Sequence, residues 1–302
     1  MNFSQMFTTI DAHVAGEAFR IIIHSPIQFH THDITTNQMK VEQHYAHEKA
    51  LLLNEPRGHR GINGCIVTPS MKADYAVLFV DHKNENRFSY SGLMATLTAL
   101  LETGNVARKK NGAYEVETVD GIYTVNAHVD KQIVDKAEIK SGDCSLIKSN
   151  GAFQLAEVDG LRRYALHSLP ESIPAIEMKY LSSIMEWGKQ NIAGMEGENI
   201  DGMILMESIS PEEVRSVTFE MDGAILRSPG VDSTFAIYTA LLEKGEQILQ
   251  IVNHSIFGSQ LSAIQDGESA HRFSIETQAF VTGEHQFLYD QEDPLEYGFL
   301  LK

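Results

Sequence analysis

The chain has 302 residues, of which 43% are hydrophobic and 22% are charged, and its formal net charge is −17. This length allows two domains with cores of their own, and the composition is ordinary for a globular protein. The excess of acidic residues, with no Lys/Arg-rich run to offset it, argues against nucleic acid or an anionic membrane as a partner.

Hydrophobic spacing and turn residues predict a mixture of helices and strands. In chain order we expect a strand at residues 18–25, a helix at 37–53, a strand at 73–81, a helix at 91–102, a hairpin over 114–125, a helix at 173–187 and a hairpin over 214–226. Each hairpin has an Asp-Gly pair at its turn, which favours antiparallel pairing of its two arms.

A five-residue word, TALLE, occurs at residues 98–102 and again at 239–243, an offset of 141 residues. A strand-like run and a Ser/Gly-rich turn precede each copy. The repeat indicates two related halves, each with a helix whose N-terminus exposes backbone N–H groups and the positive end of a dipole. Two such N-termini facing each other across a cleft would bind a small anion.

The two cysteines, Cys65 and Cys144, are too few for a disulfide framework and fit a reducing compartment. The first residues contain no basic segment of a secretion signal, and no apolar run approaches the roughly 18 residues that a membrane span needs. We therefore expect a soluble, cytoplasmic protein.

Several short motifs, in their order and spacing, resemble the proline racemase family over nearly the whole chain. They are residues 10–17 (IDAHVAGE), 54–59 (NEPRGH) followed by Gly64, 102–104 (ETG), 227–229 (RSP), 281–283 (VTG), 293–294 (DP) and 298–299 (GF). The resemblance implies an α+β fold like that of diaminopimelate epimerase, with two pseudo-symmetric domains that each wrap strands around a central helix. It places the first domain at residues 1–127 plus 286–302 and the second at residues 128–285, with the substrate between the two helix N-termini.

The chemistry of that family needs two groups around one α-carbon. Inverting the carbon takes a base on one face and an acid on the other, in a closed, dry pocket. The resemblance implies cysteine thiols for both roles, because a helix N-terminus can tune a thiol toward thiolate. In the related dehydratases of 3-hydroxyproline a threonine replaces the second cysteine, and some epimerases have serine at the first position.

Aligned with the two catalytic motifs of the family, this chain lacks both cysteines. Ser89 takes the first catalytic position and Gly230 takes the second, and the repeat offset of 141 links the same two residues. Gly230 has no side chain with which to move a proton. Leu226 stands where the family offers an acid to the substrate amine, and Asp232 adds a negative charge at the second helix N-terminus.

Each polar residue of these motifs also has a structural interpretation. Asp232 is either a first-turn acid that stabilises its helix or a substitute acid, base or amine-binding group. Ser89 and Ser91, the latter standing where a histidine is usual, could be helix caps, and a serine hydroxyl is a poor base unless a neighbour activates it. His13 and His59 lie in family-like segments and either border the cleft or form structural hydrogen bonds. The resemblance assigns substrate binding to Tyr90, Ser91, Leu226, Val231, His13 and His59.

Two groups of residues have the types and spacing of metal ligands: His44, His47 and Glu48 on one helical face, and His30 with His32 on an extended stretch. Neither is a complete ligand set, so we expect no metal. No phosphate loop or dinucleotide fingerprint is present. We expect no nicotinamide or pyridoxal cofactor.

Two classes of function follow. The first is a cofactor-independent racemase, epimerase or dehydratase that acts on the α-carbon of a proline-like or other small amino acid, with Ser89 as its remaining catalyst and without efficient racemisation of proline. The second is a non-catalytic family member whose cleft binds a small molecule or a protein partner. Because one side of the cleft lacks a proton-transferring group, one-base elimination is chemically easier than two-base racemisation. We expect a small amino-acid-like ligand and allow for a homodimer.

Overall fold

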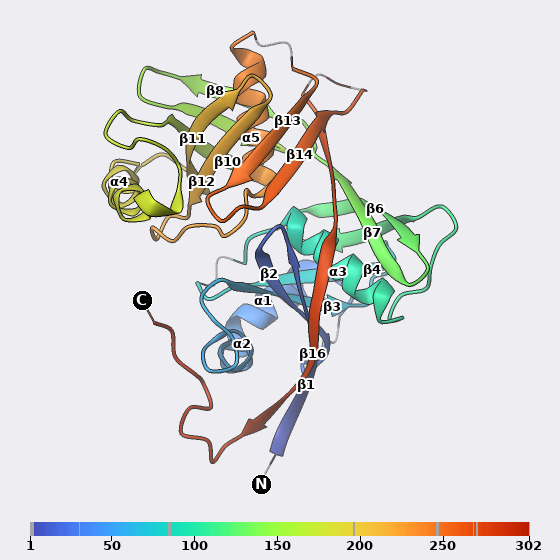
Figure 1. Cartoon of the computed structure of the whole chain (residues 1–302). Helices are drawn as coiled ribbons and strands as arrows, with labels where there is room; N and C mark the ends of the chain where they lie inside the picture. Colours follow the sequence, from blue (N-terminus) through green and yellow to red (C-terminus); the bar gives the residue numbers. More distant parts are fainter. Residues whose placement is uncertain are drawn as a thin grey trace. The chain divides into compact units, whose positions relative to one another are not determined.

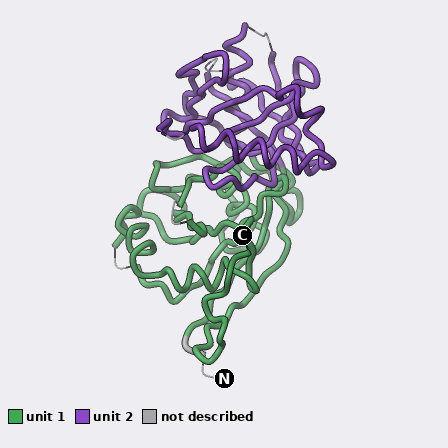
Figure 2. The backbone as a smooth tube through the Cα atoms, turned by 90° about the vertical axis from the view of Figure 1, so that its left-hand side faces the viewer, with its two compact units in different colours: residues 1–137, 278–302 green, residues 138–277 purple. Residues whose placement is uncertain are grey.

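The computed structural model describes residues 3–29, 31–83, 86–195, 197–245, 248–267, 269 and 271–301. The chain divides into two compact units, residues 1–137 with 278–302 and residues 138–277 (Figure 2). The boundaries expected near residues 127 and 285 fall inside strands β6 (Gly121–Asp130) and β16 (Ala279–Asp290). Both of these strands lie wholly within the first unit.

The first unit wraps its strands around helix α3 (Tyr90–Glu102), which is buried at every residue from Tyr90 to Leu101 (Figure 1). A helix that is buried all round is a central helix rather than a surface helix. The strand order is β16-β1-β2-β3-β4-β5-β6-β7. The further strands are β1 (Phe3–Val14), β2 (Glu17–His24), β3 (Ile62–Thr68), β4 (Tyr75–Val80), β5 (Ala113–Thr118) and β7 (Ile133–Lys140). Strand β7 continues past Ala137, the last residue of this part of the first unit. Helices α1 (Ile34–His44) and α2 (Ala46–Leu53) pack against the sheet through Val41, Leu51 and Leu52.

The second unit repeats this plan around helix α5 (Val231–Glu243), which is also buried over most of its length. Its strands lie in the order β15-β14-β13-β12-β11-β10-β9-β8. They are β8 (Ser145–Ser149), β9 (Gln154–Val158), β10 (Arg162–Ser168), β11 (Gly202–Ser210), β12 (Glu213–Phe219), β13 (Gln250–Ser255), β14 (Gln260–Gln265) and β15 (Phe273–Thr277). Helix α4 (Leu181–Ala193), which follows a 3-10 turn at Met178–Tyr180, packs against the sheet at Gly188, where the ring of Phe219 approaches closely.

Strand pairing confirms the duplication inferred from the repeated word. From β1 to β6 successive pairs are antiparallel, parallel, antiparallel, parallel and antiparallel. The pairs from β9 to β14 follow the same series. In each unit the central helix connects the strands of the second parallel pair, β4 to β5 and β12 to β13. The starts of α3 and α5 differ by 231 − 90 = 141 residues and their ends by 243 − 102 = 141 residues.

Three of the elements expected from sequence differ in the structure. The helix expected at residues 173–187 begins only at Leu181, because Pro170 and Pro174 disfavour helical backbone before it. The helix expected at residues 37–53 is two helices that break at Tyr45, with φ −120° and ψ 30°. The second hairpin is reduced to one bridge, between Phe219 and Ile225, although the first hairpin forms as β5 and β6. Within the described ranges, no helix has the length and apolar character that crossing a membrane requires.

Candidate active site

Ser89 is the residue at which helix α3 starts. Its backbone is extended, with φ −141° and ψ 119°, and its Oγ accepts a hydrogen bond from the Gly92 N–H at 3.1 Å. Serine is a preferred N-cap because it satisfies one of the N–H groups that the first turn cannot pair within the helix. The side chain is only partly buried. The capping role is therefore established, and it leaves the hydroxyl proton for another partner.

That partner is Glu17, the last residue of the IDAHVAGE motif and not one of the predicted site residues. Ser89 Oγ donates to Glu17 Oε1 at 3.3 Å. Glu17 is the first residue of β2 and pairs with Val14 directly across a two-residue turn. The turn residues, Ala15 and Gly16, both have positive φ, 49° and 98°, which is the geometry that matches the twist of a tight hairpin. The hairpin thus fixes the position of a carboxylate beside the N-cap of α3.

A glycine lets the first turn of α3 approach the sheet that contains β2. A Cβ on Gly92 would lie 2.8 Å from a ring carbon of Phe79 and 3.4 Å from Cys65 Sγ. Cys65 is fully buried, as expected of a core residue. Burial raises the pKa of its thiol to about 12, and the negative charge of Glu17 adds to the increase. Cys65 is therefore a protonated packing residue and not a nucleophile.

The structure brings Tyr90 and Ser91 next to Ser89 but buries their side chains. Tyr90 is 0% exposed and packs edge-on against Phe88 and Tyr123, and Ser91 is 2% exposed. Only the backbone groups of these two residues can therefore contact a ligand. First-turn N–H groups of a helix have the polarity that an anion requires.

The two predicted histidines lie on a strand of the hairpin and in a loop. His13 pairs with Ala18 on β2, so strand alternation puts it on the opposite face of the hairpin from Glu17, and its ring stacks on Phe280 at 5.4 Å. His59 lies in the loop before β3, where its Nδ1 accepts from the Gly61 N–H at 3.1 Å. The hydrogen bond of His59 matches its structural interpretation, whereas Nδ1 of His13 is buried without a hydrogen-bond partner among the described residues. The roles of both histidines stay predictions.

Gly230 starts helix α5 in a backbone conformation that favours glycine. Its φ is 73°, and it offers no side-chain cap to the helix. A Cβ at this position would lie 2.9 Å from Ser233 Oγ and 3.3 Å from Leu226 Cδ1. Leu226 thus packs over the backbone of Gly230, and the adjoining Val231 is buried. This helix N-terminus has no proton-transferring group at residue 230.

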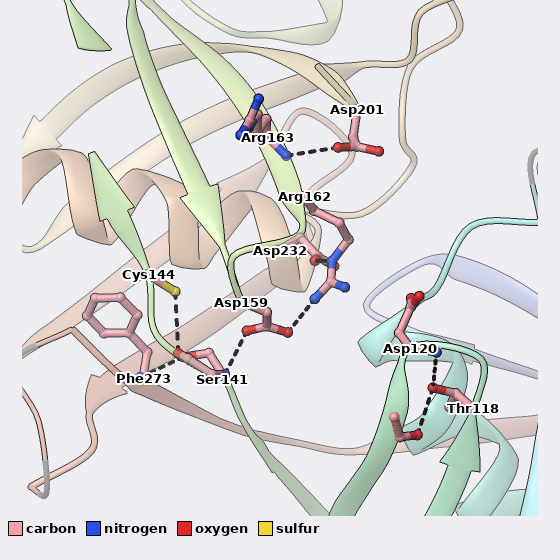
Figure 3. A network of polar contacts seen from close by, with 12 residues as sticks. Thr118, Asp120, Ser141, Cys144, Asp159, Arg162, Arg163, Asp201, Asp232 and Phe273 are labelled. Carbon is pink, nitrogen blue, oxygen red and sulfur yellow. Dashed lines mark hydrogen bonds and ion pairs between the residues drawn. The ribbon is translucent and has the colours of Figure 1, made fainter. Parts of the chain in front are cut away.

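Asp232 is held in an ion-pair network within the second unit (Figure 3). Arg162 Nε donates to Asp232 Oδ1 at 2.6 Å, and Arg162 Nη2 donates to Asp159 Oδ2 at 2.5 Å. Burial raises the pKa of the Asp232 carboxyl, while the Arg162 guanidinium opposes that shift. The network ties the first turn of α5 to the turn between β9 and β10. It favours the first-turn structural role for Asp232.

Within the residues that the structure describes, no group of three or more His, Cys, Asp or Glu side chains is close enough to hold a metal ion. The ring of His47 packs at a tilt against that of Tyr297, with ring centroids 4.4 Å apart. His30 lies outside the described residues. The expectation that the chain needs no metal or organic cofactor stays a prediction.

Comparison with known proteins gives related sequences along the full length. The family model for proline racemase matches residues 9–159, half of the chain. A trans-3-hydroxy-L-proline dehydratase of Bacillus thuringiensis subsp. konkukian is 30% identical over 336 aligned positions that cover 100% of both chains. A proline racemase of Clostridioides difficile is 25% identical over 340 positions, again covering 100% of both.

A solved structure shows the same fold. The hydroxyproline epimerase of Agrobacterium vitis, with bound trans-4-hydroxy-L-proline, matches with a TM-score of 0.85 at 21% identity, over 100% of this chain and 96% of that one. This likeness confirms the expected α+β, diaminopimelate epimerase-like fold. The family model over half of the chain and the 30% identical relative show that the chain belongs to the proline racemase family.

Proposed function

We propose that this chain is a cofactor-independent dehydratase that removes the α-proton of a proline-like amino acid and expels its β-hydroxyl as water. Relatives along the full length include dehydratases as well as racemases, and the relative at 30% identity acts on trans-3-hydroxy-L-proline by its name. The proposed catalyst is Ser89, at the N-terminus of α3.

The difference between the two central helices carries this proposal. Ser89 presents a hydroxyl at the start of α3, whereas Gly230 presents no side chain at the equivalent start of α5. Racemisation needs a proton acceptor on one face of the α-carbon and a donor on the other. Elimination needs one base and a leaving group. The proposal therefore relies on Ser89, because it is the one of these two residues whose side chain can transfer a proton.

The geometry of the substrate fits chemistry on one face. In trans-3-hydroxyproline the hydroxyl lies on the ring face opposite the carboxylate, which is the face that also carries the α-hydrogen. The base takes the α-proton, the C–H electron pair forms the Cα=Cβ double bond, and the hydroxyl leaves with a proton as water. Both events occur on the same ring face, so the trans isomer does not need a second acid from residue 230.

The substrate carboxylate would lie at the first turn of α3, where the backbone N–H groups of Tyr90 and Ser91 stabilise the charge that develops as the α-proton leaves. Asp232, neutralised by Arg162, is not assigned to the substrate amine. His13 and His59 are assigned supporting roles in the fold around the site.

The test is turnover of four compounds followed by NMR: trans-3-hydroxy-L-proline, cis-3-hydroxy-L-proline, trans-4-hydroxy-L-proline and L-proline. We expect water loss from the trans-3 isomer, much slower reaction of the cis-3 isomer, and no inversion of the other two. Inversion of L-proline at a rate comparable to water loss would overturn the one-sided proposal and require a second acid, with Asp232 the first residue to substitute.

Gly230 and Leu226 also favour a second candidate function, the binding of an amino-acid-like ligand without turnover. Neither side chain can move a proton. Calorimetric titration of the same four compounds separates the two functions. Binding of a compound without the appearance of any product in its NMR spectrum would support the binding role and contradict the dehydratase.

A further inference from the structure

We propose that Glu17 accepts the hydroxyl proton of Ser89 as Ser89 removes the substrate α-proton, so that the two residues act as one catalytic base. This proposal rests on the proposed function and identifies the partner that Ser89 needs. Glu17 lies in the first unit, like Ser89, and the contact between them joins residues 72 positions apart in the chain.

The hydrogen bonds of Ser89 match such a role. A serine hydroxyl has one proton and two acceptor lone pairs. The proton of Ser89 is directed to Glu17 Oε1 at 3.3 Å, and one lone pair accepts from the Gly92 N–H at 3.1 Å. One lone pair remains for an incoming proton. Both side chains are partly buried, so they are shielded from bulk water and still accessible to a small ligand.

A serine hydroxyl needs this help because it is a weak base when neutral. It becomes an effective proton acceptor only if its own proton leaves at the same time, to an adjacent base. Among the described residues, Glu17 is the titratable side chain in hydrogen-bond contact with Ser89 Oγ. His13, the other titratable residue of this hairpin tip, is on the opposite face.

Two features of the backbone hold the pair together. The turn at Ala15 and Gly16 places Glu17 at the first position of β2, where β1 lies on one side and β3 on the other. Gly92 allows the first turn of α3 to pack against Phe19 and Phe79, so the N-cap is held at a fixed depth over the strand that carries Glu17. Preorganised positions of this kind are what proton transfer requires.

The step balances without any further reactant. The α-proton bonds to Ser89 Oγ while the original hydroxyl proton moves to Glu17, and the C–H electron pair forms the Cα=Cβ double bond. The departing β-hydroxyl takes a proton back from the Ser89–Glu17 pair and leaves as water. Both residues then have the protonation states with which they began.

The first arm of the test compares Glu17→Gln in two backgrounds. In the protein with Ser89, Glu17→Gln should slow water loss from trans-3-hydroxy-L-proline by about 10²-fold to 10⁴-fold, the range for loss of a general base. In the Ser89→Cys protein the same change should cost less than about tenfold, because a thiol with a pKa near 8.5 ionises by itself. Glu284→Gln, an exposed carboxylate on β16, is the control and should leave the rate unchanged.

The second arm does not depend on activity. In the Ser89→Cys protein, residue 89 is the reactive thiol, because burial raises the pKa of Cys65 to about 12 and that of Cys144 to about 11. The pH dependence of alkylation gives the pKa of the new thiol. Glu17→Gln should lower that pKa by at least about one unit, because it removes a negative charge in direct contact.

The outcomes separate this proposal from the one on which it rests. If Glu17→Gln lowers the rate of water loss equally in the Ser89 and Ser89→Cys proteins, or leaves the thiol pKa unchanged, the role of Glu17 is overturned even if the wild type eliminates water. If the wild type is inactive although the thiol pKa of the Ser89→Cys protein responds to Glu17→Gln, the proposed function is overturned, and the catalytic role of Glu17 with it.

Discussion

Ser89 and Gly230 hold equivalent positions in the two halves, and backbone conformation explains why only one of them has a side chain. Ser89 is in extended backbone, which any residue adopts, whereas Gly230 has φ 73°. A Cβ at residue 230 would also overlap Ser233 Oγ. The position that the resemblance assigns to the second catalytic residue thus has neither a side chain nor a backbone conformation that favours one, so Gly230→Cys by itself should not give two-sided chemistry.

Gly230→Ala should lower the free energy of unfolding of the second unit by about 2–4 kcal/mol, because it adds steric overlap to the cost of a left-handed φ. Gly258→Ala is the control: its φ is 88° but its added Cβ meets nothing within 4 Å. That change should cost only about 1–2 kcal/mol. Urea unfolding followed by the fluorescence of Trp187, the single tryptophan, measures both. Equal losses would show that the contact with Ser233 is unimportant.

His167 should make the stability of the second unit depend on pH. It is 7% exposed, with its ring between Phe153 and Trp187, and burial lowers the pKa of its imidazole. Because the folded-state pKa is below the unfolded value of about 6.5, the unfolded chain binds the proton first as the pH falls. The contribution of His167 to stability is thus complete above about pH 7, declines as the pH falls through 6.5 and levels off below the folded pKa.

His167→Phe removes this titration and keeps an aromatic ring beside Trp187. Urea unfolding between about pH 5 and pH 8 should therefore show a smaller acid-side loss of stability in the variant than in the wild type. His82, whose pKa is also lowered by burial, titrates in both proteins and cancels in the comparison. Identical pH dependence of the two proteins would contradict the assignment to His167.

The sequence pointed to Ser89 and Gly230 through the resemblance to two family motifs, with the repeat offset as an independent check, and the structure places both at the start of a central helix. The sequence did not identify Glu17 as the partner of Ser89, or Arg162 as the partner of Asp232, because those contacts span 72 and 70 residues. Nothing in local spacing indicates which distant side chains meet. The motif that contains both His13 and Glu17 was visible, but only strand register shows which of the two lies on the Ser89 face.

The helices, too, were predicted correctly where local sequence determines them and incorrectly where packing with distant residues does. The first central helix, expected at residues 91–102, spans Tyr90–Glu102, because its apolar run and the turn before it are local signals. The second ends, like the first, at the last residue of the repeated word. The helix expected from residue 173 starts late, since Ile173 and Ile176 are buried in irregular chain beside Pro174. A core residue in a loop and a core residue in a helix have the same apolar spacing, so periodicity could not distinguish them.

Arg162 connects α5 to the turn between β9 and β10, and its loss should destabilise that junction. Arg162→Met leaves the carboxylates of Asp159 and Asp232 buried without their cation, which should cost about 3–5 kcal/mol. The adjacent Arg163 is the matched control, because it is 39% exposed and pairs with Glu157. Arg163→Met should cost about 1 kcal/mol or less. Similar losses of urea stability for the two variants would contradict a structural role for this network.

The C-terminal segment completes the first unit of the molecule. Strand β16 pairs with β1, and Arg57 then binds the segment beyond it through Asp293 and the carbonyls of Leu295 and Glu296. The sequence predicted a return of residues 286–302, but the strand begins at Ala279. That a homodimer forms, that the protein is cytoplasmic and that both helix N-termini serve one substrate stay predictions, to be tested by light scattering, by cell fractionation and by a crystal structure with ligand.

The central claim is that this family member eliminates water with a base at Ser89 and does not invert an α-carbon. The most direct measurement incubates the wild type and Ser89→Ala with trans-3-hydroxy-L-proline in heavy water, and L-proline in parallel, and follows the α-proton signal and the products by NMR. We predict loss of the α-proton together with dehydration in the wild type, a rate at least about 10²-fold lower in Ser89→Ala, and no inversion of L-proline. Inversion of L-proline by the wild type, or an undiminished rate in Ser89→Ala, would contradict the claim.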